Sequence, residues 1–368
     1  MIGILPKIPA YQAFRRFGFP KMMPLNLTVS VTYRCNSRCR TCRVYEKRAA
    51  ELSLKEYGKI FRSLGRAPYW LTVSGGEPFL RKDLADICLS AHENCRPKII
   101  NLPTNGLLSK IIPEQVERIA RNCRDAQVIV NLSLDDIGER HDDIRQAAGS
   151  YERAMETYSR LRGLRQANLA VGIHSVISKH NVDHFPQICS DLLKLKPDSY
   201  ITEIAEERVE LGTVGEDFTP SAEEYAAAVD FLSKTIRGQR FEGISRITQA
   251  FRLQYYELVK RTLREKKQVL PCYAGFMSAQ IAPDGEVWAC CVKAESLGNL
   301  RDAGYDFRKI WRSDQADAIR GPIRRRQCFC PLANAGYTNM LASYRTLGRV
   351  LRKLAAEKFK KRPESSIC

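Results

Sequence analysis

The sequence has no apolar run of about 18 residues, the length that a membrane-spanning helix requires. It also lacks internal repeats and low-complexity stretches. Residues 1–24 mix prolines with basic residues and have no continuous apolar centre before a small-residue cleavage site, unlike a secretory signal. We therefore expect a cytoplasmic protein, in which the 13 cysteines serve as ligands, catalysts or core residues rather than as disulfides.

What the sequence does contain is an ordinary globular composition with a strong positive charge. Of its 368 residues, 44% are hydrophobic and 27% are charged, which suits two domains or one barrel-sized domain with an extension. The net charge is +18, and residues 345–362 hold eight Lys or Arg against the single acid Glu357. This localised basic tail predicts an anionic partner.

Short β-branched or apolar runs alternate with segments of helical spacing between residues 25 and 215. The pattern predicts strands at 25–32, 70–74, 99–103, 128–134, 169–177 and 199–204. It predicts helices at 53–66, 81–95, 113–123, 149–165 and 182–195. Six strands with intervening helices indicate an α/β fold of parallel βα units, either an open sheet or an incomplete barrel. The loops after the strands then form the chemical face.

The pattern changes on both sides of this region. Residues 1–24 form a basic and apolar arm, and residues 216–270 form a helical connector. Residues 271–337 form a small cysteine-bearing segment, in which Asp284-Gly285 predicts the tight turn of a hairpin. Residues 338–368 are expected to form one basic amphipathic helix and a tail.

Cys35, Cys39 and Cys42 directly follow the first predicted strand, so they lie in a loop on the chemical face. Their spacing lets one short loop wrap three thiolates around a compact metal centre, and we expect the neighbouring arginines to favour the thiolate forms. Structural zinc normally requires four protein ligands, and a four-iron cluster has four irons to ligate. Three cysteines therefore leave one metal position open.

This C-x3-C-x2-C motif after the first strand resembles the signature of the radical S-adenosylmethionine (SAM) superfamily. The resemblance implies a partial (β/α)6 barrel and a [4Fe-4S] cluster on the three cysteines, with SAM chelating the fourth iron. "SGGEPFL" after the second strand is similar to the family's GGE motif, and "TNG" and "LSLDD" follow where the family has further SAM contacts. The resemblance thus assigns SAM binding to Gly75, Gly76, Glu77, Asn105, Ser133 and Asp135. Thr41 departs from the family, where an aromatic residue often packs on adenine.

A second set of cysteines lies in segment 271–337 and resembles the auxiliary-cluster extension called SPASM in its full form and twitch in its shorter form. The phrase "GEVWAC" matches the family's hairpin ligand, which points to Cys290 rather than Cys291. The resemblance implies one auxiliary [4Fe-4S] cluster, which favours the shorter form, on Cys272, Cys290, Cys328 and Cys330. Cys291 replacing one ligand and a small zinc site are the alternatives.

Four further cysteines lie within helical patterns: Cys88, Cys95, Cys123 and Cys189. Cys88 and Cys95, seven residues apart on one helix face, are best explained as core residues. His174, near the end of the fifth strand, is either a SAM or substrate contact or a hydrogen-bonded barrel residue. After the sixth strand, "EIAEERVE" gathers carboxylates at the expected barrel mouth. These carboxylates could bind substrate hydroxyls or take a proton after radical formation, and a solvated loop face is the alternative. We select Glu203, the acid nearest the strand end, as the candidate catalytic residue.

The resemblance implies an enzyme that cleaves SAM reductively to a 5'-deoxyadenosyl radical, which removes hydrogen from an unactivated carbon. An auxiliary cluster that accepts the remaining electron would make the net reaction an oxidation. An electron donor such as flavodoxin or ferredoxin is implied as partner. A plain iron-sulfur electron carrier is the non-enzyme alternative, but it leaves the SAM-pocket motifs unexplained.

The substrate is open between two classes. The basic amphipathic helix, together with "FRRFGFPKMM" near the start, suggests a peripheral enzyme at the inner face of the membrane that acts on a lipid or lipid-linked precursor. The alternative, maturation of a ribosomally made peptide, has against it that only residues 1–24 precede the first strand, too few for a leader-recognition domain. We expect no nucleic-acid partner, because no basic platform is interleaved with aromatic residues.

Overall fold

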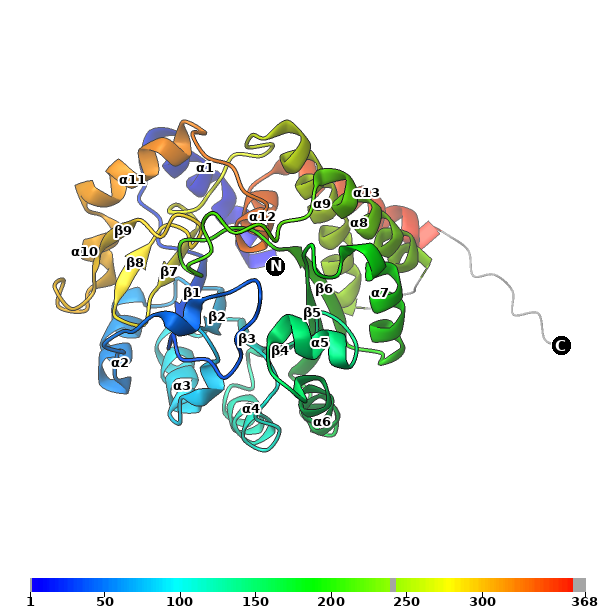
Figure 1. Ribbon diagram of the computed structural model, residues 1–368. Helices are drawn as coiled ribbons and strands as arrows, with labels where there is room; N and C mark the ends of the chain where they lie inside the picture. The colour runs from blue at the N-terminus through cyan, green and yellow to red at the C-terminus, as the bar shows by residue number, and fades with distance from the viewer. Residues whose placement is uncertain (1, 239–242, 360–368) are drawn as a thin grey trace.

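The computed structural model describes residues 2–238 and 243–359 and contains one nine-stranded sheet in the order β6-β5-β4-β3-β2-β1-β7-β8-β9. The strands β1 to β6 are all parallel and curve around one side of the molecule without closing (Figure 1). Their bounds are β1 Asn26–Ser30, β2 Trp70–Ser74, β3 Ile99–Thr104, β4 Gln127–Ser133, β5 Leu169–Ile177 and β6 Ser199–Ile204. The predicted α/β fold with a partial six-stranded barrel is therefore confirmed.

The helices between these strands cover the outer face of the arc (Figure 1). They are α2 Leu54–Leu64, α3 Leu84–Cys95, α4 Ile111–Asn122, α6 Ser150–Arg162 and α7 Phe185–Lys194. The short helix α5 Glu139–Arg145 lies instead against the loop after β1, where Arg40 N donates to Ile144 O. Three-residue 3-10 turns add η2 Val44–Glu46, η3 Pro78–Leu80 and η4 Val182–His184. The five helices predicted in this region are found with ends within three residues, whereas α5, which follows β4 closely, was not predicted.

Alternation along the strands separates an apolar outer face from a polar inner face. In β2, β3 and β6 every second residue is buried against the helices. On the inner face the amide of Asn101 donates to Thr72 Oγ1 at 3.4 Å and accepts from the Asn131 amide at 2.7 Å. Polar side chains thus link neighbouring strands across the inside of the arc, which leaves this face suited to polar ligands.

The hairpin of the predicted cysteine-bearing segment extends the barrel sheet. β7 (Ser278–Ile281) pairs in parallel with β1, and β8 (Glu286–Trp288) returns antiparallel to β7. The turn between them contains Gly285 at φ +92°, a conformation that favours glycine, so the Asp284-Gly285 prediction is confirmed. The short strand β9 (Ser296–Asn299) was not predicted. Helices α10 (Phe307–Trp311) and α11 (Asp314–Arg324) follow it.

The remaining helices pack on the open side of the arc (Figure 1). The N-terminal arm forms η1 (Ile2–Lys7) and α1 (Ile8–Phe17), and the connector forms α8 (Ala222–Gly238) and α9 (Gly243–Glu265). No helix in the described part of the chain is long and apolar enough to cross a membrane.

The single C-terminal helix predicted from residue 338 onward is wrong, because α12 (Ala333–Leu341) and α13 (Tyr344–Phe359) are separated at Ala342-Ser343. Along α13, Val350 is 3% exposed, and Leu347 and Leu354 pack against the main core. Part of the apolar stripe of this basic helix therefore packs within the protein, whereas Tyr344 and Leu351 are 56% and 65% exposed. Residues 360–368 of the predicted tail lie outside the described residues.

Candidate functional site

The first three cysteines lie in the loop that follows β1, each partly exposed. Hydrogen-bond donors face all three sulfurs. Cys35 Sγ accepts from Ser37 N at 3.4 Å, Cys42 Sγ accepts from Val44 N at 3.5 Å, and Cys39 Sγ accepts from Arg145 Nη1 at 3.7 Å. Donors of this kind stabilise metal-bound thiolates and tune the cluster that they hold.

The expectation that the arginines of the loop itself would favour the thiolates is wrong. These arginines pair with acids on other elements, such as Arg34 with Glu51, or bond to backbone carbonyls. Burial raises the pKa of Cys35 to about 11 and of Cys42 to about 12. The positive charge of bound metal must therefore supply the stabilisation that makes them thiolates at neutral pH.

Arg145, at the end of α5, is the only arginine that hydrogen-bonds to one of these sulfurs among the described residues, and sequence reasoning missed it. Its Nη2 lies 2.8 Å from Asp135 Oδ2, and both side chains are almost completely buried. Asp135 also accepts from Val176 N at 2.8 Å, which fixes the carboxylate to β5. Asp135, which the resemblance assigns to SAM binding, already binds Arg145 and holds it beside Cys39. No sequence signal identified Arg145, because 106 residues separate it from that cysteine.

The two glycines of the SGGE motif lie directly against the beginning of the cysteine loop. A Cβ on Gly75 would lie 2.3 Å from Thr32 O, and one on Gly76 would lie 2.4 Å from Arg34 O. Gly76 N also donates to Thr32 O at 2.8 Å. Only glycine fits here, because the loop after β2 and the loop after β1 touch through their backbones. This explains why the motif needs both glycines.

Glu77 is fully buried at the end of this motif. Its Oε1 accepts from Phe79 N and Thr104 Oγ1, and its Oε2 accepts from Asn105 N at 2.8 Å. Burial raises the pKa of Glu77 to about 7, while these donors and Arg145 oppose the rise. A carboxylate has about four acceptor positions, so Oε2 retains capacity for one further donor.

Asn105 connects the third strand to the cysteine loop. Its amide Nδ2 contacts Cys35 Sγ at 3.8 Å and donates to Asn36 Oδ1 at 2.7 Å, and its Oδ1 accepts from Leu107 N. Ser133 ends β4 opposite His174 of β5 and is partly exposed on the inner face. The structure therefore brings Asn105 and Glu77 together with Cys35, and leaves Ser133 on the open inner face.

Glu203 lies near the end of β6 with its side chain 23% exposed, as its selection for the barrel mouth requires. Its Oε1 lies 3.5 Å from His174 Nε2, a buried nitrogen with no hydrogen-bond partner. Its Oε2 lies 3.6 Å from Arg208 Nη2. The Glu203 carboxylate therefore lies between the imidazole of His174 and the guanidinium of Arg208. His174, left between two interpretations by the sequence, forms a pair with Glu203.

The other glutamates of "EIAEERVE" separate into different roles. Glu206 is buried beside Arg208 at 3.0 Å, and burial raises its pKa to about 7. Glu210 crosses to the first strand, where its Oε1 accepts from Ser30 Oγ at 3.2 Å and from the amide of Gln280. Glu207 faces Gly215 in an exposed loop. Glu203, Glu206 and Glu210 therefore belong to the mouth, and Glu207 does not.

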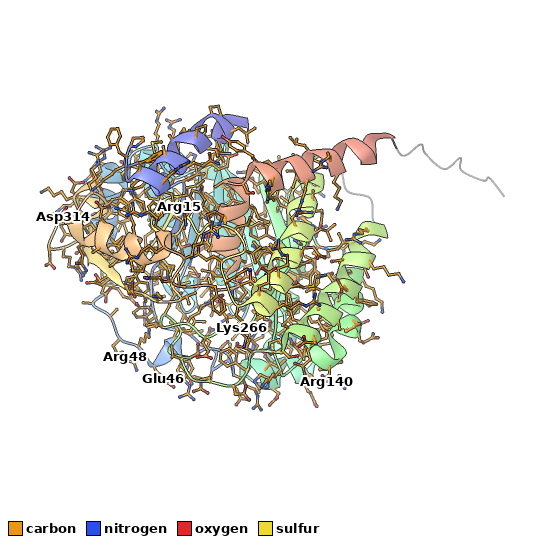
Figure 2. All side chains as sticks on the ribbon, turned by 90° about the horizontal axis from the view of Figure 1, so that it is seen from above. Arg15, Glu46, Arg48, Arg140, Lys266 and Asp314 are labelled. Atoms are coloured by element: carbon orange, nitrogen blue, oxygen red, sulfur yellow. The ribbon has the colours of Figure 1, made fainter. Side chains whose placement is uncertain are left out.

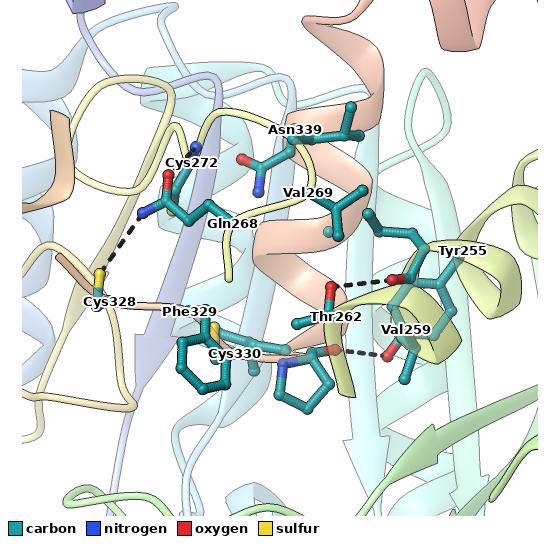
Figure 3. A pocket seen from close by; sticks show the side chains of 15 residues that line it. Tyr255, Val259, Thr262, Gln268, Val269, Cys272, Cys328, Phe329, Cys330 and Asn339 are labelled. Carbon is teal, nitrogen blue, oxygen red and sulfur yellow. Dashed lines mark hydrogen bonds between the residues drawn. The ribbon is translucent and has the colours of Figure 1, made fainter. Parts of the chain in front are cut away.

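The four cysteines of the second predicted set come together from three separate segments. Cys272, Cys328 and Cys330 line one pocket, which Figure 3 shows between the loops that carry them and α9. Cys290, just after β8, lines an adjoining pocket that shares Leu332 with the first. Each of Cys272 and Cys330 has its pKa raised further by the charge of Cys290, which indicates that the sulfurs are near one another. The donor set fits one cluster.

Gln268 organises this second set and was not predicted. Its side-chain amide nitrogen Nε2 donates to Cys328 Sγ at 3.7 Å, and its Oε1 accepts from Cys272 N at 3.2 Å (Figure 3). Tyr255 of α9 donates to Pro331 O at 2.9 Å, next to Cys330. Gln268 in the turn after α9 and Tyr255 on α9 thus hold the loops that carry the second set of cysteines, much as Asn105 and Arg145 hold the first set.

Cys291 lines the same pocket as its neighbour Cys290 and packs with Cys330. It is buried, and after burial the charges that act most on its pKa are those of Glu210 and Arg208. The choice of Cys290 over Cys291 as ligand therefore stays a prediction. Cys88 and Cys95, assigned to the core, are 0% and 3% exposed, and Cys123 and Cys189 are also 0% exposed. Cys368 lies outside the described residues.

The residues of both sets fit iron-sulfur clusters by the chemistry of their donors. Each set offers only thiols as ligands, with amide, guanidinium or backbone N–H groups aimed at the sulfurs. Within the described residues, no three His, Cys, Asp or Glu side chains lie close enough together to hold a single metal ion.

Comparison with known families agrees with this division. The model of the radical SAM superfamily matches residues 29–192, and the model of the SPASM iron-sulfur cluster-binding domain matches residues 272–331. The radical SAM family implies a [4Fe-4S] cluster and SAM as cofactors, and the SPASM domain implies auxiliary iron-sulfur clusters.

Three individual proteins show how far the similarity extends. Pre-heme d1 synthase of Dinoroseobacter shibae is 30% identical over 173 residues, which are 46% of this chain but only 39% of that protein. Mycofactocin maturase MftC of Mycobacterium ulcerans is 25% identical over 305 residues, 79% of this chain and 75% of that protein. The crystal structure of SuiB of Streptococcus suis bound to SAM shares the fold, with a TM-score of 0.61 at 14% identity over 85% of this chain and 71% of SuiB. With both family models matched in order on this fold, the chain is a radical SAM enzyme that carries a SPASM-type auxiliary iron-sulfur segment.

Proposed function

We propose that this enzyme cleaves SAM reductively and uses the resulting radical to oxidise a peptide substrate. The observation that carries the first half is the contact between the cysteine loop and the SGGE motif, where Gly76 N bonds to Thr32 O and Glu77 N bonds to Arg34 O. A cluster held by Cys35, Cys39 and Cys42 would supply the electron that splits SAM into methionine and a 5'-deoxyadenosyl radical, and one held by Cys272, Cys290, Cys328 and Cys330 would accept the electron that the substrate radical loses. The protein contributes positioning and exclusion of water.

The residues around the first cysteines hold SAM in this proposal. Glu77 Oε2 keeps acceptor capacity for the SAM amino group, and Gly75 and Gly76 let the backbone approach it closely. Ser133, on the open inner face, binds the ribose side. Asp135 acts indirectly in this scheme, because its carboxylate already binds Arg145, which faces Cys39.

Glu203 takes the proton that leaves the substrate when the substrate radical loses its electron. The position of His174 Nε2, 3.5 Å from Glu203 Oε1, supports this role, because an imidazole at this place can relay the proton away from the carboxylate. Arg208, 3.6 Å from the other oxygen, orients the carboxylate. The overall change in the substrate is the loss of two hydrogens, one to the adenosyl group and one as a proton.

A peptide is the substrate class that the observations favour over a lipid. The case for a lipid rested on the basic amphipathic C-terminal helix together with "FRRFGFPKMM", and three apolar residues of that helix, Leu347, Val350 and Leu354, pack on the protein. One relative matched over most of the chain is a maturase, mycofactocin maturase. The polar inner face, with Asn101 and Asn131 on neighbouring strands, suits the amide groups of a peptide.

The cleavage step is tested on anaerobically reconstituted protein with dithionite and SAM. The wild type should release 5'-deoxyadenosine, and Cys42→Ala should lose this activity. Cys189→Ala, which changes a buried thiol of α7 away from both sets, is the matched control and should retain it. Equal activity of Cys42→Ala and wild type would refute the assignment of the first cluster.

The substrate class is tested by mass spectrometry of cells with and without the protein. We expect a peptide whose mass is lower by two hydrogens only when the protein is present. A matching change confined to the lipid extract would contradict the peptide proposal and restore the lipid hypothesis.

A further inference from the structure

Four arginines gather on the surface beside the auxiliary cysteines: Arg15 of α1, Arg324 at the end of α11, and Arg325 and Arg326 just after it. The last three are exposed, and Arg15 is partly exposed. We call these four residues the arginine surface. Arg15 lies between α1 and the α11 region (Figure 2), where its Nη2 donates to Arg324 O at 3.2 Å.

The arginine surface lies directly over the proposed cluster ligands. Arg15 Nε donates to the carbonyl oxygen of Cys272 at 2.8 Å, and Arg326 is two residues before Cys328. Cys328 and Cys330 are themselves partly exposed, and Phe329 between them is 48% exposed. An electron that enters or leaves this set therefore has a short path to the surface at this point.

None of these four guanidinium groups forms an ion pair with an acid in the described part of the chain. Around the first cysteines, by contrast, Arg34, Arg40 and Arg43 each pair with an acid of this chain. Unpaired like charges held together at the surface are the arrangement that attracts an anionic partner.

We propose that the arginine surface is the docking site of an acidic electron-carrier protein that exchanges electrons with the auxiliary cluster. The proposal rests on the proposed function only in assuming that the auxiliary cysteines hold a cluster. An anionic membrane or a nucleic acid fits the charge but has no reason to lie over redox-active thiols. An electron carrier fits both features, and such contacts are small and driven largely by charge.

The test measures anaerobic binding of holoenzyme to oxidised flavodoxin, an acidic electron carrier used as the probe, at low and high salt. The double change Arg324→Glu with Arg326→Glu should weaken binding about tenfold or more at low salt, and wild-type binding should weaken as salt rises. The matched control, Arg165→Glu with Lys196→Glu, makes the same charge change on exposed loops after α6 and α7 and should alter affinity less than about twofold.

Several outcomes would overturn the proposal. These are absence of wild-type binding at low salt, equal weakening by the control pair, and loss of binding to phosphatidylglycerol vesicles with flavodoxin binding intact. Iron content shows whether each variant is folded and loaded. If the double variant loses iron, the neutral pair Arg325→Gln with Arg326→Gln replaces it, with an expected weakening of about threefold. Dithionite-driven cleavage of SAM by the wild type tests the proposed function separately, since a small reductant needs no docking protein.

Discussion

The two cysteine regions of this protein are both rich in arginine, but they use it in opposite ways. Around Cys35, Cys39 and Cys42 the arginines of the loop are neutralised by acids from other elements, and one distant arginine, Arg145, reaches a sulfur. Around Cys272, Cys328 and Cys330 an amide, Gln268, reaches the sulfur, and the arginines stay unpaired at the surface.

The difference indicates separate tasks. In the first region paired charges fix the geometry of a loop that must also bind SAM, because ion pairs to α5 and to the loop after β6 hold it on two sides. In the second region the geometry comes from hydrogen bonds of α9 and its following turn, so the arginines remain free to meet a partner. We propose that the first region serves the chemistry and the second the exchange of electrons.

The largest effect should come from removing one cysteine set at a time. Replacement of Cys35, Cys39 and Cys42 by Ala should reduce bound iron from about eight to about four and abolish dithionite-driven release of 5'-deoxyadenosine. Replacement of Cys272, Cys328 and Cys330 by Ala should also remove about four irons but leave measurable cleavage of SAM. Iron analysis and chromatography of the adenosine product measure both. Loss of cleavage in both variants would show that the two regions are not separable.

The next effect concerns Arg145, which gives the first region its rigidity. Arg145→Ala leaves the buried carboxylate of Asp135 unpaired, and this should lower the free energy of unfolding by about 3–5 kcal/mol. Denaturant unfolding of the metal-free protein measures the change. The control Arg40→Ala breaks the exposed pair with Asp143 and should cost less than about 1 kcal/mol. Similar costs for the two variants would contradict the special role of the buried pair.

A smaller effect is expected for Gln268, the corresponding residue of the second region. Gln268→Leu keeps the side-chain size but leaves Cys272 N and Ile323 O without this partner, which should lower the free energy of unfolding by about 1–3 kcal/mol. The auxiliary irons should also be lost to a chelator faster than in the wild type, while the first four irons are retained. Equal release from both regions would argue against a local role for Gln268.

The smallest effect distinguishes paired from unpaired arginines. Arg43→Gln removes an exposed pair with Glu216 and should lower the free energy of unfolding by up to about 1 kcal/mol. Arg325→Gln removes no ion pair of the described chain and should change it by less than about 0.5 kcal/mol. High salt should reduce the difference between the two variants. A larger cost for Arg325→Gln would mean that the arginine surface has a structural role.

Much of the fold followed from local patterns. The six strands and the helices between them were predictable because strand and helix periodicities are properties of neighbouring residues, and the 25–215 region alternates them regularly. The break at Ala342-Ser343 was missed because the amphipathic pattern continues across it. The pairing of β7 with β1 was missed because it joins segments about 250 residues apart.

The sequence by itself determined the candidate groups for the chemistry. Cysteine spacing, paired glycines before Glu77 and the acid Glu203 at a strand end are short-range features, and each places a reactive group on a known side of a βα unit. Only the tertiary structure decided what surrounds them. Arg145 beside Cys39, His174 beside Glu203 and the unpaired arginines over Cys272 depend on contacts between distant segments. No local pattern encodes such contacts, because a charge is neutralised or left free only when the folded chain brings its neighbours into place.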